Sequence, residues 1–517
     1  MSSVRLRKYL IFILPFIFLL IFFVLQFIAL RNHSQSFYFQ DETEHVTLGW
    51  MMEEYGSALY KDLSTNHQPL PILTGAVFSK VINSQTLFQL IERLRIGMFL
   101  FNFLLSIFIV FRFRWKGLLS VLFLQSLAYL YFGWYVLAES LVTPFVSLIV
   151  LYLLEKLFEK KKSSISDLGV MSFSLFWVAF NLLPLWPFVG LVSLVYLFNL
   201  SFKDRKIFIG LIGFFTLLLF TQIPFFNWVE ETFYHLVKYY LPYNQELGSF
   251  GVLQIILLPL TSVFYLQNEV ARFLFFGLLL IIFLSRDTIK KRKDWLQLGL
   301  VIFLVIFLNN RVTDVKKVFF EGFHLYPFIG GFSALVSFVV IKGLSYKRIW
   351  RSLLVGLVVS FLILGNMGWF WESKDKVSEH NIQYGEQQAF ASALEVLKDS
   401  EDRLLTGADG YGYINMVSGL PLADRQNFHL DWSYRVPKLR AEFKEMIINN
   451  PPEFIYFKTN SSDYYKELTL EDNYVELLRG DSSATNLYIH KTKAQSISEN
   501  QWYDLIGQSF IKPVFID

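Results

Sequence analysis

Long apolar stretches separated by short polar connections run from the start of the chain to about residue 371. The first stretch, Tyr9 to Leu30, holds about 22 residues, which is enough to cross a bilayer and more than the apolar part of a secretory signal. No Ala-x-Ala cleavage site follows it, so we interpret it as a retained spanning helix. Further apolar runs lie near 96–111, 117–133, 138–154, 168–183, 185–200, 207–223, 268–285, 295–309, 325–341 and 350–367. The pattern predicts an α-helical polytopic membrane protein with about eleven transmembrane helices.

Basic residues gather in every second connection, in register with the basic N-terminus. The clusters are Arg112/Arg114/Lys116, Lys156/Lys160/Lys161/Lys162, Lys203/Arg205/Lys206, Arg286/Lys290/Lys291/Arg292/Lys293 and Lys342/Lys347/Arg348/Arg351. Because basic connections stay in the cytoplasm, we expect a multi-pass protein of the cell membrane with a cytoplasmic N-terminus. An odd helix count then places the C-terminal region on the extracytoplasmic side. The run 250–266 could also span, but spanning would move the cluster at 286–293 outside, so we expect it to be interfacial or re-entrant.

Composition agrees with a membrane protein. The 517 residues are 54% hydrophobic and 17% charged, whereas a soluble protein carries about a quarter charged residues. The net charge of +4 is too small to indicate nucleic-acid binding. The chain has no Cys, which excludes disulfides, a thiolate nucleophile and Cys-based metal sites.

The chain divides into two regions by composition. Residues 1–371 form the predicted transmembrane region, and its first external loop, 31–95, is largely too polar to enter lipid. Residues 372–517 have the composition of a soluble domain, in which helical patterns alternate with short β-rich runs such as 453–458 and 485–490. This alternation predicts a C-terminal extracytoplasmic α/β domain.

Acidic residues cluster about ten residues after the first helix. Asp41, Glu42 and Glu44 lie beside His45, and the order Asp41-x-x-Glu44 before Val46 is typical of a capping box that starts a helix. The alternative is a general base, because a partly desolvated carboxylate at the membrane surface can accept a proton. Helix capping and base catalysis by Asp41 are compatible if Glu42 or Glu44 shares one of these two roles.

Several short motifs resemble those of one enzyme group. Gly56-x-x-Leu59-Tyr60-x-Asp62 and His67-Gln68-Pro69 follow the acidic cluster, Ala138-Glu139-Ser140 precedes Thr143-Pro144, and Gly322 to Pro327 gives an aromatic-His-Pro entry to a late helix. In the C-terminal region, Gly419-Leu420-Pro421 and the run Asn450 to Ile455 also resemble motifs of this group. The chain therefore resembles the GT-C superfamily of integral membrane glycosyltransferases. Its nearest likeness is glycosyltransferase family 39, which includes protein O-mannosyltransferases and the transferase that adds aminoarabinose to lipid A.

The resemblance implies an activity and a set of site residues. It implies an inverting transfer of a sugar from a polyprenyl-phosphate donor to an acceptor hydroxyl, with Asp41 as catalytic base and Glu42 beside it. A phosphate leaves as a stable anion, so the leaving group needs cations and N–H donors rather than an acid. The family often has Lys-Pro-Pro where this chain has His67-Gln68-Pro69, which puts the usual phosphate contact in doubt. The residues that we consider for substrate binding are Glu44, His67, Glu92, Arg93, Arg95, Glu139, Arg311 and His324.

Each of these residues also has a structural interpretation. Arg93 and Arg95 can mark a helix end at the interface, His324 can bond a helix end, and Arg311 can be solvated. Glu92 and Glu139 lie near predicted helix ends, where a carboxylate needs a partner or water. No metal site is indicated, and a divalent cation at His45 with its acidic neighbours is the one candidate by ligand type.

Two other classes of function remain open. A transporter or flippase of lipid-linked sugars would commonly show repeated halves and interrupted helices, and neither is visible in the sequence. A membrane-anchored binding or assembly protein would need no carboxylate at Asp41. The expected partners are the donor lipid, the surrounding membrane lipid and an acceptor that the sequence does not identify.

Overall fold

The computed structural model describes residues 3–82, 86–246, 291–308, 322–344, 374–407, 412–428, 430–457, 470–506 and 510–511, together with single residues and the short stretches 281–283 and 285–286 between these ranges. Residue contacts divide the chain into two compact units. The helical unit comprises Met1–Asn32, Arg95–Thr221 and Gly248–Ser373. The mixed unit comprises His33–Leu94, Gln222–Leu247 and Lys374–Asp517. Nearly all of the predicted first external loop therefore belongs to the same compact unit as the C-terminal region.

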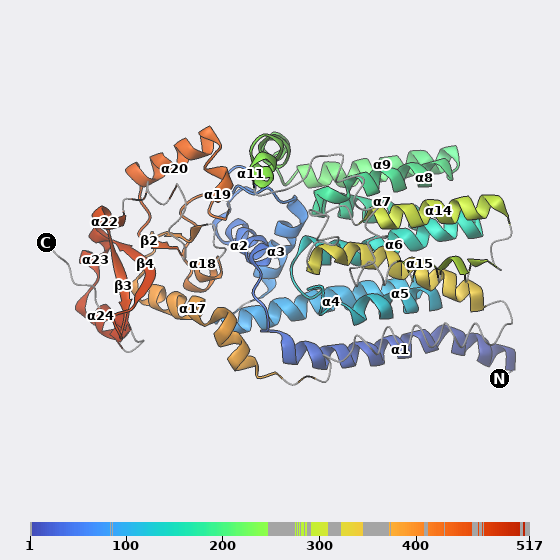
Figure 1. The fold of residues 1–517 in the computed structure, drawn as a ribbon, viewed down its shortest axis with the longest axis horizontal. Helices are drawn as coiled ribbons and strands as arrows, with labels where there is room; N and C mark the ends of the chain where they lie inside the picture. Colours follow the sequence, from blue (N-terminus) through green and yellow to red (C-terminus); the bar gives the residue numbers. More distant parts are fainter. Residues whose placement is uncertain are drawn as a thin grey trace. The chain divides into compact units, whose positions relative to one another are not determined.

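The helices centred in the helical unit run alongside one another (Figure 1). They are α1 (Ser3–His33), α4 (Leu87–Phe113), α5 (Trp115–Ser126), α6 (Ala138–Leu154), α7 (Ile165–Asn181), α8 (Trp186–Phe198), α9 (Phe202–Phe220), α14 (Arg292–Phe307) and α15 (Tyr326–Leu344). Helix α6 is central: its side chains are buried from end to end, and it packs on α7 and α15. It continues as the π-helix η1 (Glu155–Glu159), while the 3-10 turns η2 (Leu183–Leu185) and η4 (Gly322–Leu325) precede α8 and α15.

The outer surface of the helical unit is apolar. Phe198, Leu217 and Leu104 are 77%, 73% and 65% exposed. A soluble protein rarely exposes so many large apolar side chains to water, whereas a membrane protein exposes them to lipid. Within the described residues, four helical segments are long and apolar enough to cross a membrane, and a fifth would combine a bent pair. The four are Ile13–His33, Leu87–Phe113, Ala138–Glu159 and Phe323–Lys342, and the pair is Phe202–Phe220 with Phe225–Tyr243. The chain is a multi-pass helical membrane protein.

The predicted total of about eleven spans stays a prediction. The runs near 117–133, 168–183 and 185–200 give helices of 12, 17 and 13 residues, which are shorter than a usual span. The runs at 250–266 and 350–367 lie outside the described residues.

A five-stranded sheet forms the centre of the C-terminal part of the mixed unit. Its strands are β1 (Leu404–Leu405), β2 (Phe454–Tyr456), β3 (Tyr474–Arg479), β4 (Ala484–His490) and β5 (Phe510–Ile511), in the order β1-β2-β4-β3-β5. Strands β1 and β2 are parallel, and the other neighbouring pairs are antiparallel. The helices of this part are α17 (Lys376–Leu397), α18 (Tyr413–Ser418), α19 (Leu430–Ser433), α20 (Pro437–Asn449), α22 (Leu470–Asn473), α23 (Lys491–Ser496) and α24 (Glu499–Ile506).

Alternating side chains of β2 enter two different cores, as the pleat of a strand requires. Phe454 and Tyr456 pack into the cluster that contains residues of α17 and α24, whereas Ile455 packs with Phe443 of α20. The sheet is therefore covered on both faces. Three more helical segments complete the mixed unit: α2 (Gln40–Tyr55), α3 (Pro69–Val81), and the consecutive α10 (Phe225–Val229), η3 (Glu230–Tyr240) and α11 (Leu241–Glu246).

Candidate functional site

Two glycines allow α2 and α3 to pack with their backbones in contact. A Cβ atom on Gly49 would lie 2.2 Å from the backbone nitrogen of Ala76, and a Cβ atom on Gly75 would lie 2.2 Å from the carbonyl oxygen of His45. No larger side chain fits at either position without moving a helix. This close approach fixes the acidic half of α2 against the start of α3.

Asp41 lies in the first turn of α2 rather than at its cap. The N-cap is Phe39, which is extended, and no side chain caps the helix. The capping-box interpretation of Asp41 is therefore wrong, because Asp41 is the second residue of the helix, where its carboxylate can still interact with the helix dipole. Asp41 is half-buried, while Glu42 is fully buried. Of these two predicted catalytic residues, only Asp41 keeps contact with the surface.

Glu44 and His67, two of the predicted substrate-binding residues, lie together. Glu44 is buried, its Oε1 accepts a hydrogen bond of 2.6 Å from the Thr65 hydroxyl, and its Oε2 is 3.4 Å from His67 Nε2. The His67 backbone N–H donates to the Thr65 hydroxyl at 3.0 Å, and the Tyr60 hydroxyl donates to the His67 carbonyl at 2.7 Å. The His45 ring meets the His67 ring edge-on, with centroids 4.8 Å apart. The loop before α3 is thus tied to α2 through one carboxylate.

A second buried carboxylate, Glu231 of η3, holds the same loop from the other side. Its Oε2 accepts from the Ser64 hydroxyl at 2.9 Å and lies 3.2 Å from His235 Nδ1, and its Oε1 accepts from the Arg425 guanidinium. Glu231 therefore joins three segments that are far apart in sequence.

The two predicted residues at the start of α4 differ in environment. Glu92 pairs with Lys376 of α17 at 2.8 Å, which gives it a structural partner within the mixed unit. Arg93 is exposed. Neither the ion pair of Glu92 nor the exposure of Arg93 assigns a substrate role.

In the helical unit, Glu139 and His324 form a buried pair. His324 Nδ1 lies 2.6 Å from Glu139 Oε1, and both side chains are less than a tenth exposed. Arg95 is also buried, and its guanidinium lies over the Tyr135 ring, 3.3 Å from the centroid. Such a stacked guanidinium is held at low entropic cost and can offer its N–H groups to an anion. Arg311 lies outside the described residues.

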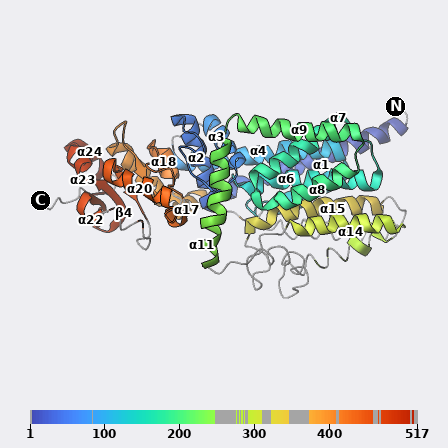
Figure 2. The ribbon, with the colours of Figure 1, turned by 90° about the horizontal axis from the view of Figure 1, so that it is seen from above.

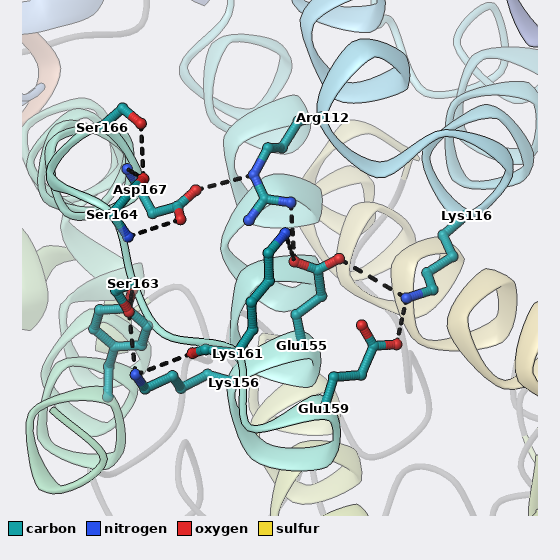
Figure 3. Close-up of polar contacts among 11 residues, drawn as sticks. Arg112, Lys116, Glu155, Lys156, Glu159, Lys161, Ser163, Ser164, Ser166 and Asp167 are labelled. Atoms are coloured by element: carbon teal, nitrogen blue, oxygen red, sulfur yellow. Dashed lines mark hydrogen bonds and ion pairs between the residues drawn. The ribbon is translucent and has the colours of Figure 1, made fainter. Parts of the chain in front are cut away.

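A cluster of ion pairs joins the ends of four helical segments (Figure 3), and the sequence had indicated its basic residues but not their acidic partners. Arg112 of α4 is 2.9 Å from both Glu155 of η1 and Asp167 of α7. Lys116 of α5 pairs with Glu159 at 2.5 Å and lies 3.8 Å from Glu155. These charges come from connections predicted to face the cytoplasm, and pairing makes their partial burial tolerable. We interpret the cluster as structural.

Within the described residues, no group of three or more His, Asp or Glu side chains is arranged to hold a metal ion. The divalent cation considered at His45 stays a prediction. The contacts that sequence reasoning missed are those of Thr65, Ser64, Glu231 and Arg425, for which no local motif gave a signal.

Comparison with known proteins points to one fold. No family model and no curated protein matches the chain. Among solved structures, apo ArnT from Cupriavidus metallidurans aligns over 94% of this chain and 98% of its own, with a TM-score of 0.51 and 12% identity. The same protein bound to undecaprenyl phosphate aligns over 90% and 96%, with a TM-score of 0.53 and 13% identity. The chain shares its fold with ArnT. The predicted resemblance to GT-C membrane glycosyltransferases is thereby confirmed at the level of the fold.

A third structure aligns less well. The oligosaccharyltransferase of Archaeoglobus fulgidus, tethered to an acceptor peptide, matches 88% of this chain and 72% of its own, with 10% identity and a TM-score of 0.49. That score is too low to carry an argument. The identity to ArnT is also low enough that the likeness describes the fold and not the substrate.

Proposed function

We propose that the chain is a glycosyltransferase that moves a sugar from a polyprenyl-phosphate donor to an acceptor hydroxyl at the outer face of the membrane. The observation that carries the proposal is the fold shared with ArnT over 94% of this chain, since one ArnT structure holds undecaprenyl phosphate. The acidic start of α2, which directly follows the first membrane helix, supplies the carboxylate that such a reaction needs.

The proposed chemistry requires a single base. The acceptor oxygen forms a bond with the anomeric carbon while the bond from that carbon to the phosphate oxygen breaks. The electron pair of the broken bond leaves on the polyprenyl phosphate, and the acceptor proton passes to the Asp41 carboxylate. Attack opposite to the leaving phosphate inverts the anomeric centre. Asp41 is proposed for this role because it is half-buried and accessible, whereas Glu42 beside it is enclosed and would support it.

The departing phosphate needs positive charge and N–H donors. In the helical unit we assign this role to His324 and Arg95, and by its charge to Arg311. His67 of the mixed unit is proposed for the same role on its own chemistry. The support for His324 is its contact with Glu139, which fixes the orientation of the imidazole ring. The support for Arg95 is its burial and stacking on Tyr135, which hold the guanidinium ready to bind an anion.

Lipid analysis tests the proposal. Cells that lack the protein should accumulate a polyprenyl-phosphate sugar and lose one glycosylated protein, lipid or glycan, as measured by mass spectrometry. Wild-type protein should restore the product and Asp41→Asn protein should not. If Asp41→Asn restores the product fully, the proposed base is wrong. If the donor instead accumulates on the cytoplasmic leaflet alone, the transporter alternative replaces the enzyme.

A further inference from the structure

The segment Phe225–Glu246 is one continuous helix made of α10, η3 and α11, and it is shown side-on in Figure 2 under the label α11. Its inward face begins with the buried aromatic residue Trp228 and is polar beyond it. Glu231, Thr232 and His235 are each no more than 2% exposed, and Glu231 makes the contacts to Ser64 and Arg425 described above. A helix on a water-soluble protein normally turns its apolar residues inward, so this burial of polar residues is the reverse of the usual pattern.

Aromatic contacts confirm which face is turned inward at the C-terminal end of the helix. The Tyr240 ring meets the Trp432 ring with centroids 5.5 Å apart, and the Tyr243 hydroxyl donates to Asp431 at 3.3 Å. Glu230 accepts from Lys438 of α20 at 3.4 Å. The helix is therefore attached to α19 and α20 along its polar and aromatic side.

The outward face is apolar. Phe226 is 83% exposed, Tyr234 50%, Val237 61% and Leu241 38%. Lys238 lies on the same side, with its amine 5.0 Å from the Tyr234 ring centroid and 2.6 Å from the Tyr234 hydroxyl. Apolar residues flanked by Tyr and Lys are typical of a helix that lies in a membrane interface.

We propose that the outward face of the Phe225–Glu246 helix rests on the lipid bilayer, with Phe226, Val237 and Leu241 at the boundary between headgroups and acyl chains. Helix α9 ends at Phe220, and the five further residues to Phe225 reach at most about 18 Å, so this face begins close to the end of an apolar membrane helix. Leu217 and Leu218 near the end of α9 are 73% and 54% exposed, as expected of a helix that contacts lipid.

A second copy of the chain is a weaker occupant for this face. One side of a single helix offers far less than the roughly 800 Å² per partner that a stable protein interface buries. Lipid has no such requirement, because it covers any apolar strip continuous with the bilayer. The inference does not depend on sugar transfer. In this position the helix holds the Glu231 network, and with it the loop before α3, at the membrane surface.

The absence of Cys makes the test direct, since each Cys substitution gives a unique labelling site. A nitroxide is attached to full-length Phe226→Cys and Val237→Cys proteins in vesicles of phosphatidylethanolamine and phosphatidylglycerol. Power saturation then compares collisions with oxygen, which concentrates in lipid, and with a water-soluble nickel chelate. Glu445→Cys, an exposed position on α20, is the aqueous control, and Leu217→Cys is the lipid control.

The proposal predicts that oxygen collisions exceed nickel collisions at both 226 and 237, as at 217, and that the order reverses at 445. Greater nickel accessibility at 226 and 237 would place the face in water and overturn the proposal. Low accessibility to both reagents would show that protein covers the face, and this would overturn it as well.

Discussion

Single residues carry most of the chemistry proposed for this chain, and their surroundings differ from what the local sequence indicates. Asp41-x-x-Glu44 has the spacing of a capping box, yet the N-cap of the helix is Phe39, two residues before Asp41, and the two carboxylates have different environments. The Glu44 carboxylate accepts a hydrogen bond from the Thr65 hydroxyl and lies beside the His67 imidazole, both of which come from a loop about twenty residues further along the chain. The residue types were predictable from sequence, whereas their partners depend on tertiary contacts that no short pattern encodes.

Asp424 provides a prediction about stability and pH. Burial raises the pKa of Asp424 to about 7, and none of the described residues donates a hydrogen bond to its Oδ2. In the unfolded chain this carboxyl loses its proton near pH 4, so between about pH 4 and 7 the folded state binds more protons than the unfolded state. Stability should therefore fall as pH rises through this window and level off above it.

Replacing this carboxyl with an amide should remove the effect. Asp424→Asn protein in detergent should unfold at a higher temperature than wild type at about pH 8, by the equivalent of a few kcal/mol, and the difference should shrink toward about pH 5. Glu445→Gln, which changes an exposed carboxyl, should behave as wild type. An Asp424→Asn protein whose melting temperature follows wild type at both pH values would refute the raised pKa.

His324 can be tested with a defined lipid. If its imidazole contacts the donor phosphate, His324→Ala should weaken binding of undecaprenyl phosphate to the purified protein roughly 10- to 100-fold, the worth of one charge-assisted hydrogen bond. His324→Gln keeps an N–H donor and should lose less. The control is His490→Ala at the end of β4. Unchanged binding by His324→Ala protein with a wild-type melting temperature would remove this residue from the phosphate site.

At the scale of elements, continuous apolar runs were the most predictable feature. The run 138–154 is the helix Ala138–Leu154, because an uninterrupted apolar segment buried on all sides has no competing structure. The run 96–111 gave only part of α4, which begins at Leu87 and includes the polar residues Glu92 and Arg93. Polar residues at the end of a membrane helix conceal its start from a hydrophobicity pattern.

The contact between α2 and α3 yields a prediction at this scale. Gly75→Ala places a Cβ atom against the backbone of His45, so the helices must separate, at a cost of about 1–3 kcal/mol. Its melting temperature should fall, and sugar transfer should fall with it, because Glu44 lies beside His45. Gly210→Ala in α9, where a Cβ atom meets nothing within 4 Å, is the matched control and should be neutral or stabilising. Equal melting temperatures for the two variants would contradict the close packing.

At the scale of the whole molecule, the association of distant segments could not be predicted. Ser64 and Glu231 are 167 positions apart, and Arg425 is 194 positions from Glu231. The sequence alone indicates that Ser64, Glu231 and Arg425 belong to separate segments, and only folding brings these segments into one unit. The fold shared with ArnT was predictable in outline from short motifs and the order of apolar runs, because both reflect how a chain crosses lipid.

Orientation in the membrane is a prediction that rests on the basic connections. An impermeant maleimide applied to intact cells should label Glu445→Cys protein, in the mixed unit, and should not label Lys162→Cys protein until the membrane is opened. The reverse result would place the mixed unit in the cytoplasm, and with it the carboxylates of α2.

Sugar transfer by purified Asp41→Asn protein tests the central claim most directly. The donor is the polyprenyl-phosphate sugar that accumulates in cells without the protein, and the melting temperature is measured on the same samples. Asn keeps the size of Asp and loses the ability to take a proton, so transfer should fall by roughly 10²–10⁴ while melting changes little. Glu54→Gln, at the exposed end of the same helix, should keep full activity. Full transfer by Asp41→Asn protein with unchanged melting would contradict the account.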